Sequence, residues 1–183
     1  MVIPEVSREY EIPEGIEVKL EKQVLTVSGN DITLSRKLSR GIQPEIEDGK
    51  ITISMQFPST RKVAIFGMQA SMIENMIIGV QRGFRARLKV ISSHFPITTE
   101  VREGVVLINN FLGERYPRKA KIHPGIEVSI EGEFLTVKGP DRDGVAQTAA
   151  NIEQGTIVRN RDRRIFQDGI YLIEKTSPME ESI

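Results

Sequence analysis

Four arginines stand close together near the C-terminal end of the chain, in a pattern that suits phosphate binding. The segment Arg159-Asn-Arg-Asp-Arg-Arg164 places them within six positions, and Asn160 lies between the first two. The planar guanidinium group makes paired hydrogen bonds to phosphate oxygens. A solvated loop in which Asp162 pairs with the arginines is the alternative. The predicted phosphate contacts are Arg159, Asn160, Arg161, Arg163 and Arg164.

A second group of basic residues, between Asn109 and Lys121, is mixed with amides, aromatic residues and glycine. Loops of this composition suit folded RNA, which proteins recognise through shape, stacking and charge with little base code. An ordinary charged hairpin with Phe111 in the core explains the same residues equally well. The candidate RNA contacts in this group are Asn110, Arg115, Arg118 and Lys119.

The charge of the chain is balanced in total but uneven along its length. The whole chain has 25 basic and 25 acidic residues, whereas the net charge is −3 over residues 1–60, +7 over 61–122 and −4 over 123–183. A basic block can attract phosphate although the whole chain is neutral. Within this block, Arg85, Arg87 and Lys89 alternate along one predicted strand, which indicates a solvated sheet face rather than a binding site.

No motif for catalysis or metal binding accompanies these basic groups. The two histidines, His94 and His123, each precede proline-containing segments and are interpreted as loop or strand-end residues. The run Asp141-Arg-Asp-Gly resembles a calcium loop only at its start, because Val145 and Ala146 stand where a ligand and a glycine are required. It predicts a turn and a helix N-cap instead. We expect no enzymatic reaction, no cofactor, no bound metal and no small-molecule substrate.

Cysteine is absent, so disulfides and thiolate metal sites are excluded. No stretch approaches the roughly 18 consecutive apolar residues of a membrane helix, and the N-terminus lacks the pattern of a signal peptide. We therefore expect no membrane association.

An internal repeat provides the elements that must position the basic groups. Residues 12–29 read IPEGIEVKLEKQVLTVSG and residues 122–139 read IHPGIEVSIEGEFLTVKG, with ten identities in eighteen positions. Each copy contains two strand-like stretches of alternating apolar and polar residues, separated by a two-residue turn. This pattern is typical of a β-hairpin. Gly29 and Gly139 end the second strand of each hairpin. A duplication of one module is the simplest explanation.

The periodicity of apolar residues in the rest of the sequence predicts an α+β fold of two tandem duplicated domains. Each domain is an antiparallel β-sheet with one helix packed on one face. An apolar stripe predicts a first helix over residues 60–80, and Asp143-Gly144 opens a second, shorter one. The predicted domains are residues 1–83 and 84–175, followed by a flexible tail, 176–183. The other predicted strands are Ile32–Lys37, Ile42–Glu47, Lys50–Phe57, Arg85–Ser92, Ile97–Arg102, Val105–Asn110, Lys119–Ile122 and Ile170–Ile173.

Several motifs resemble one known family, over about residues 8–175. They resemble ribosomal large-subunit protein six, in its archaeal and eukaryotic branch. The motifs are Ile73–Phe84, His94–Ile97, Asn110–Arg115 and Arg159–Tyr171.

This resemblance implies a cytoplasmic, ribosome-bound protein that supports translation. It implies binding to folded large-subunit rRNA near the sarcin–ricin loop and the translation-factor site, beside neighbouring ribosomal proteins. The family makes its main RNA contact with the C-terminal copy, which here corresponds to the Arg159–Arg164 segment and, in addition, Lys175. The alternatives are a protein–protein adaptor that recruits partners through its sheet edges, and an enzyme of unrecognised type.

Overall fold

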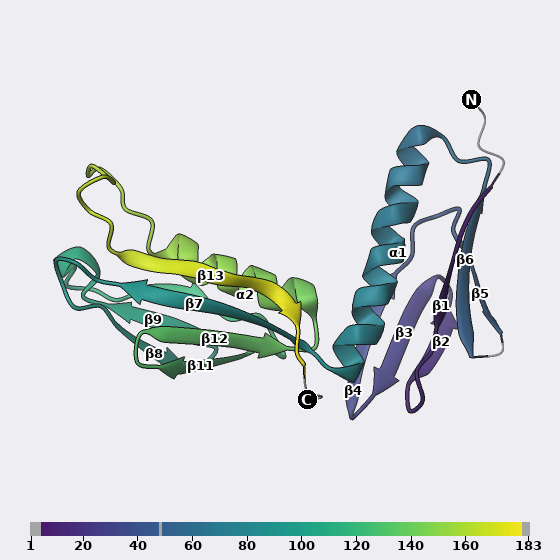
Figure 1. The fold of residues 1–183 in the computed structure, drawn as a ribbon, viewed down its shortest axis with the longest axis horizontal. Coiled ribbons are helices and arrows are strands. Elements are labelled where there is room, and N and C mark those ends of the chain that lie inside the picture. The colour runs from purple at the N-terminus through teal and green to yellow at the C-terminus, as the bar shows by residue number, and fades with distance from the viewer. Residues whose placement is uncertain (1–4, 48, 181–183) are drawn as a thin grey trace. The chain divides into compact units, whose positions relative to one another are not determined.

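The computed structural model describes residues 5–47 and 49–180, and it divides into two compact units, one ending at Arg82 and the next beginning at Gly83. Each unit combines antiparallel strands with one long helix (Figure 1). The predicted α+β class, with two repeated units, is therefore confirmed. Among the described residues each unit pairs its strands into two sheets, where the sequence predicted one.

Unit 1 packs its helix α1 (Thr60–Gln81) against two three-stranded sheets, ordered β1-β6-β5 and β2-β3-β4. The predicted apolar stripe of α1 is the buried one, since Phe66, Ala70, Ile73, Ile77 and Val80 are all buried. The strands are β1 (Glu5–Glu11), β2 (Glu17–Glu21), β3 (Val24–Gly29), β4 (Ile32–Lys37), β5 (Gln43–Glu47) and β6 (Lys50–Gln56).

Strand β1 was missed by the sequence patterns, although it pairs with β6 along its whole length. Its inward phase holds Val6, Arg8 and Tyr10, of which Arg8 is exposed. The charged residue interrupts the apolar alternation that identifies a half-buried strand.

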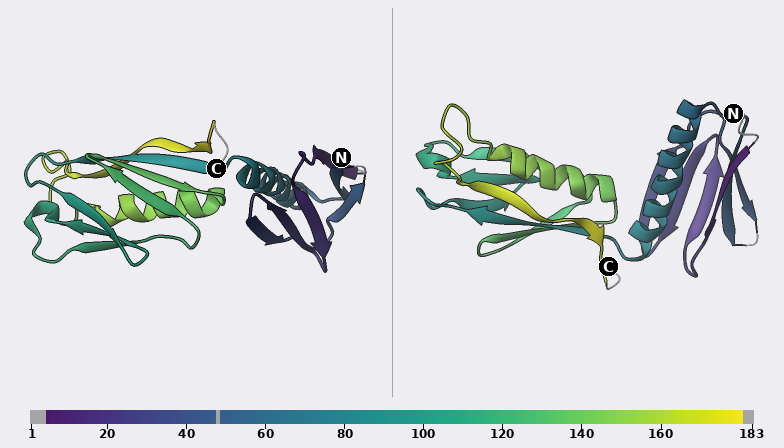
Figure 2. Two further views of the ribbon diagram at one scale, coloured as in Figure 1. Left: turned by 90° about the horizontal axis from the view of Figure 1, so that it is seen from below. Right: turned by 45° about the horizontal axis from the view of Figure 1, so that its top comes forward.

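Unit 2 packs its helix α2 (Arg142–Gly155) on the four-stranded sheet β11-β12-β7-β13, with a three-stranded sheet β10-β9-β8 beside it (Figure 2). Helix α2 is shorter than α1, and the Asp141 side chain accepts a hydrogen bond from the Asp143 amide at its start, as the predicted N-cap requires. The strands are β7 (Phe84–Ile91), β8 (Thr98–Arg102), β9 (Val105–Asn109), β10 (Arg118–Lys121), β11 (Glu127–Glu131), β12 (Phe134–Gly139) and β13 (Gly169–Pro178), with a 3-10 turn at Phe111–Gly113.

The last strand is longer than the sequence predicted. Strand β13 continues to Pro178, because Ser177 pairs with Arg85 and Pro178 with Phe84 on β7. The prediction that the flexible tail begins at residue 176 was therefore wrong for residues 176–178. The last part of that predicted tail, residues 181–183, lies outside the described residues.

Among the described residues there is one helix, α1, that is long enough and apolar enough to cross a membrane, judged by length and composition alone. The helix at the core of a folded domain has the same properties. Eight residues of α1 are buried in unit 1, where the helix packs against the sheets.

The repeated glycines that end the hairpins make the same close approach in both units. A Cβ atom on either glycine would meet the carbonyl oxygen of the glycine that opens the hairpin, the isoleucine after it, and a helix valine. Only a residue without a side chain leaves room there. These neighbours are Gly15, Ile16 and Val80 around Gly29, and Gly125, Ile126 and Val145 around Gly139.

We expect Gly29→Ala to destabilise unit 1 by about 1–3 kcal/mol, the usual cost of overpacking a filled site. The added Cβ would lie 3.0 Å from the Gly15 carbonyl oxygen, which belongs to the backbone and yields little. Gly67→Ala in α1 is the matched control, because nothing lies within 4 Å of its Cβ position. That change should be neutral or stabilise by up to about 1 kcal/mol. Urea unfolding of both variants checks this, and equal stabilities would contradict it.

Candidate nucleic-acid interface

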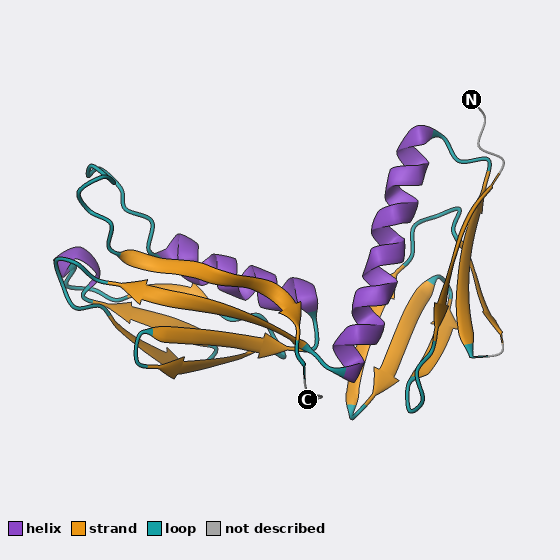
Figure 3. Cartoon of the chain, in the orientation of Figure 1, coloured by secondary structure: helices purple, strands orange, loops and turns teal. Residues whose placement is uncertain are grey.

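Three loops meet at one end of unit 2 and bring together basic residues that lie far apart in the sequence. They are residues 92–97 after β7, 110–117 after β9, and 156–168 between α2 and β13 (Figure 3). The Asn110 side-chain amide donates to the Pro96 carbonyl at 3.0 Å, and Arg118 donates to the Ile157 carbonyl at 3.1 Å. We call this surface the three-loop end.

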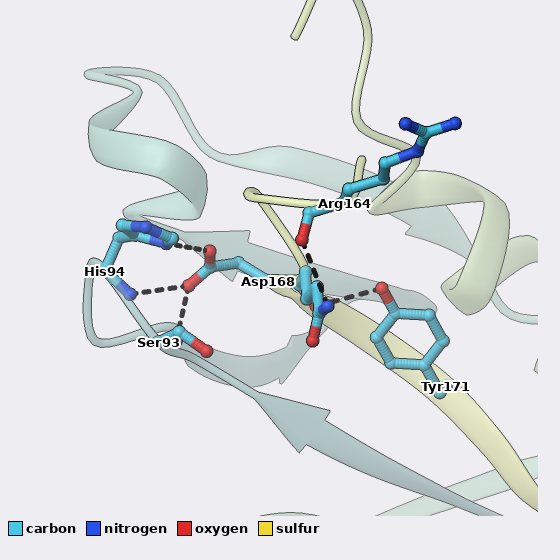
Figure 4. Close-up of polar contacts among 6 residues, drawn as sticks. Ser93, His94, Arg164, Asp168 and Tyr171 are labelled. Atoms are coloured by element: carbon cyan, nitrogen blue, oxygen red, sulfur yellow. Dashed lines mark hydrogen bonds and ion pairs between the residues drawn. The ribbon is translucent and has the colours of Figure 1, made fainter. Parts of the chain in front are cut away.

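The long loop of residues 156–168 is held at both of its ends. At its start, the Thr156 hydroxyl accepts from the Ile170 amide at 2.9 Å and donates to the Glu153 carbonyl at 3.0 Å. At its finish, one oxygen of Asp168 accepts from the backbone amides of Ser93 and His94, at 2.5 and 2.8 Å (Figure 4). The other oxygen lies 2.6 Å from Nδ1 of His94. The loop is therefore closed onto the β7–β8 connection.

The Asp168 carboxylate is ionised and stabilised although its side chain is only 1% exposed. Burial by itself raises the pKa of this carboxyl. The backbone amide and side chain of His94, together with the Ser93 amide, outweigh burial and lower the pKa from 3.8 to about 2. The His94 ring also packs against Phe166, with ring centroids 4.8 Å apart.

The predicted arginine segment is exposed on this anchored loop. All four arginines and Asn160 are exposed, and none of the four guanidinium groups forms a salt bridge within the described part of the chain. Arg161 stacks over the Phe166 ring at 4.8 Å. The side chain of Arg164 points away from Asp168 in Figure 4. The segment is thus presented to solvent, and no carboxylate of the described residues forms a salt bridge with its arginines.

Asp162 does not pair with the arginines around it. Its carboxylate accepts from the backbone amide of Arg164 at 2.9 Å, and its carbonyl accepts from the amides of Ile165 and Phe166. The residue therefore stabilises the turn that presents the arginines. The alternative of a loop with Arg–Asp ion pairs does not describe this structure.

The second basic group divides into residues that hold the loop and residues that are available to a ligand. Arg118 forms a bidentate pair with Glu114, at 2.8 and 2.6 Å, donates to two carbonyls at the end of α2, and lies 4.2 Å from the centre of the Phe111 ring. The hydrogen bond from Arg118 lowers the pKa of Glu114. Asn110 adopts a left-handed conformation, with φ of 57°, and bonds to Pro96. Both residues position the loop.

Arg115 and Lys119 of the same group are exposed, the first in the loop and the second on β10. Lys175 lies elsewhere: it lines a groove of about 340 Å³ between α2 and β13, together with Arg142. The structure thus separates Lys175 from the three-loop end, although the resemblance grouped it with the arginine segment.

Two of the three alternating basic residues of β7 are engaged in pairs on the sheet, whereas Arg85 is exposed. Arg87 pairs with Glu174 at 2.9 Å and Lys89 approaches Glu133 at 3.8 Å. Both cations also lie over the Phe134 ring, at 5.4 and 5.5 Å. These pairs reduce the attraction of this face for phosphate.

Sequence reasoning missed the pair of His94 and Asp168, and it interpreted His94 as an ordinary loop residue. The two are 74 positions apart and meet only because β7 pairs with β13. No local pattern marks either residue. In the described residues no group of three or more metal-ligating side chains gathers.

Comparison with known proteins agrees with the fold and the repeat. The family model described as ribosomal protein L6 matches residues 12–83 and 95–169, one segment in each unit. A relative named large ribosomal subunit protein uL6, from the archaeon Methanococcus vannielii, is 42% identical over 171 residues. That match covers 93% of this chain and 94% of the relative.

Proposed function

This chain belongs to the ribosomal protein L6 family, and we propose that it is a structural component of the large ribosomal subunit that binds folded large-subunit rRNA through its three-loop end. It acts in the cytoplasm on the ribosome, beside neighbouring ribosomal proteins, and has no reaction of its own. The observation that carries the proposal is the Arg159–Arg164 segment, exposed, free of salt bridges to described residues and anchored at both ends.

Anchoring favours binding because an ordered loop loses less conformational entropy when it meets its ligand. Phosphate contacts of this kind fix position and orientation and carry no sequence information. Recognition therefore depends on the shape of the RNA backbone. Arg115 adds a further exposed cation to the same surface. From the family resemblance we place the contact near the sarcin–ricin loop and the translation-factor site, where the protein would stabilise the RNA.

A protein–protein adaptor that recruits partners through sheet edges is less well supported. The first part of the outer edge of β13 is occupied, because the Ile170 amide bonds to Thr156 just after α2 and the Leu172 amide bonds to Glu153 of α2, at 3.3 Å. This part of the edge is closed to another strand. Sedimentation of cell lysate before and after ribonuclease treatment separates the two functions. An adaptor would keep its complexes after digestion, whereas an rRNA-bound protein would lose them.

We expect the affinity of the protein for large-subunit rRNA to fall with salt at a log–log slope of about −3 to −4. This value follows from four arginine–phosphate contacts, each of which releases condensed counterions. Filter binding or fluorescence titration between 50 and 300 mM KCl, about the range in which such slopes are resolved, measures it. A slope close to zero, or no binding to rRNA at all, would reject the proposed function.

A further inference from the structure

Tyr116 is the most exposed of the large apolar and aromatic side chains in the described residues, with 82% of its surface accessible. It forms no hydrogen bond, ring contact or cation–π contact within this part of the chain. Folding therefore does not use the side chain. An aromatic residue left this open on a functional surface is a candidate contact for a partner.

The loop around Tyr116 is closed and ordered. The bidentate pair of Glu114 and Arg118 joins the two ends of the five-residue turn, and Arg118 also fastens the turn to the Gly155 and Ile157 carbonyls. Pro117 restricts the backbone of the residue before it to extended conformations. Arg115, Tyr116 and Pro117 are consequently held out at the tip, and all three are exposed.

The charge beside this tip favours a nucleic acid. Arg115 precedes Tyr116, and Arg161 of the arginine segment is close enough to Glu114 to contribute to lowering its pKa. Arg118, at the end of the turn, donates to the Ile157 carbonyl at the start of the 156–168 loop at 3.1 Å, so the turn lies next to the proposed phosphate-binding segment. An aromatic ring among exposed arginines matches the combination of stacking and charge by which proteins hold unpaired nucleotides.

We propose that Tyr116 stacks on an unpaired base, and that the rRNA at this point is a loop or bulge. A regular duplex keeps its bases stacked inside, so it has no base face to offer, whereas loops and bulges display theirs. The inference rests on the proposed function, since it takes rRNA as the ligand. The arginines by themselves would contact only the RNA backbone, and Tyr116 would add a contact to a base.

The test compares rRNA binding by wild-type protein, Tyr116→Ala, Tyr116→Phe and Tyr116→Leu over a range of salt. Deproteinised large-subunit rRNA is the first probe, and a perfectly paired RNA duplex is the second. Phe57→Ala is the matched control, because Phe57 is also an exposed aromatic, at 71%, and lies in unit 1. Circular dichroism checks that each variant is folded.

We expect Tyr116→Ala to weaken binding to rRNA by roughly 5- to 150-fold, the range for loss of one aromatic–base stack. The salt slope should stay unchanged, because no charge is removed. Tyr116→Phe should bind like wild type, Tyr116→Leu like the alanine variant, and Phe57→Ala like wild type. Binding to the duplex should not depend on Tyr116.

Three results would overturn the inference while the proposed function stands. They are unchanged rRNA affinity of Tyr116→Ala, equal affinities of the leucine variant and wild type, or the same loss on the duplex. Unchanged rRNA affinity with poor incorporation into large subunits would identify a protein as the partner of Tyr116 instead. Failure of the wild-type protein to bind rRNA would reject the proposed function, and the inference with it.

Discussion

Replacing Arg161, Arg163 and Arg164 together with alanine is expected to weaken rRNA binding by about 50- to 200-fold at physiological salt. It should also flatten the log–log salt dependence by roughly 2–3. The flatter slope follows from the loss of three phosphate contacts, each with its released counterions. The side chains are exposed and form no salt bridge to described residues, so the fold should persist. Titration across salt concentrations measures both quantities.

The control for this variant removes the same charge from unit 1. Arg40, Arg61 and Lys62 are exposed there, and their joint replacement with alanine lowers the net charge equally. It should leave the salt slope close to wild type. Equal effects of the two triple variants would mean that total charge governs binding. An unchanged slope in the Arg161, Arg163 and Arg164 variant would remove this segment from the site.

Asp168→Asn is expected to destabilise unit 2 by about 2–3 kcal/mol at neutral pH. The asparagine keeps the size of the side chain but loses the negative charge that the His94 and Ser93 amides stabilise. This loss of stability follows from the pKa of the Asp168 carboxyl, which is lowered from its ordinary 3.8 to about 2 despite burial. Each unit of pKa shift corresponds to about 1.4 kcal/mol of folding free energy.

The difference in unfolding free energy between wild type and Asp168→Asn should become smaller as the pH falls. Above about pH 4 the carboxylate is ionised in both the folded and the unfolded chain, and its contribution is complete. As the pH falls from about 4 towards about 2, the unfolded chain binds a proton before the folded one, so the contribution disappears. Urea unfolding at several pH values measures this, and a difference that stays constant down to pH 2 would contradict it.

The same substitution should affect RNA binding in a different way from the arginine variant. Loosening the anchor of the 156–168 loop raises the entropy lost on binding, so affinity falls. The arginines remain, so the salt slope does not change. Glu103→Gln is the control, since Glu103 is an exposed carboxylate in the β8–β9 turn of the same unit. It should change neither stability nor affinity.

Most elements of the fold could be predicted because their signals are local. The helix stripe from Phe66 to Val80 and the alternation in β6 depend on periods of 3.6 and 2 residues, which any short window contains. Strand β1 escaped because Arg8 breaks its alternation, and the end of β13 escaped because its irregular pairing to β7 includes two register shifts. In both cases a partner strand decides the conformation.

The candidate site was predictable only as a set of residue types. The arginine segment and the loop after β9 could be identified from composition, since clustered arginine and mixed aromatic and amide residues suit RNA. Composition could not separate Arg115, which is exposed, from Arg118, which is bound to Glu114 and two carbonyls. Whether an arginine is exposed or bound within the protein depends on which groups the folded chain brings next to its side chain.

By itself, the sequence determined the duplication, the nature of most elements, the basic segments and the family resemblance. These are properties of neighbouring residues or of direct comparison between stretches of chain. Only the tertiary structure decided that three loops meet at one end of unit 2, and that Asp168 ties the arginine loop to His94 across 74 positions. It also placed Lys175 apart from them. The physical reason is that hydrogen bonds between distant segments form only after β13 has paired with β7.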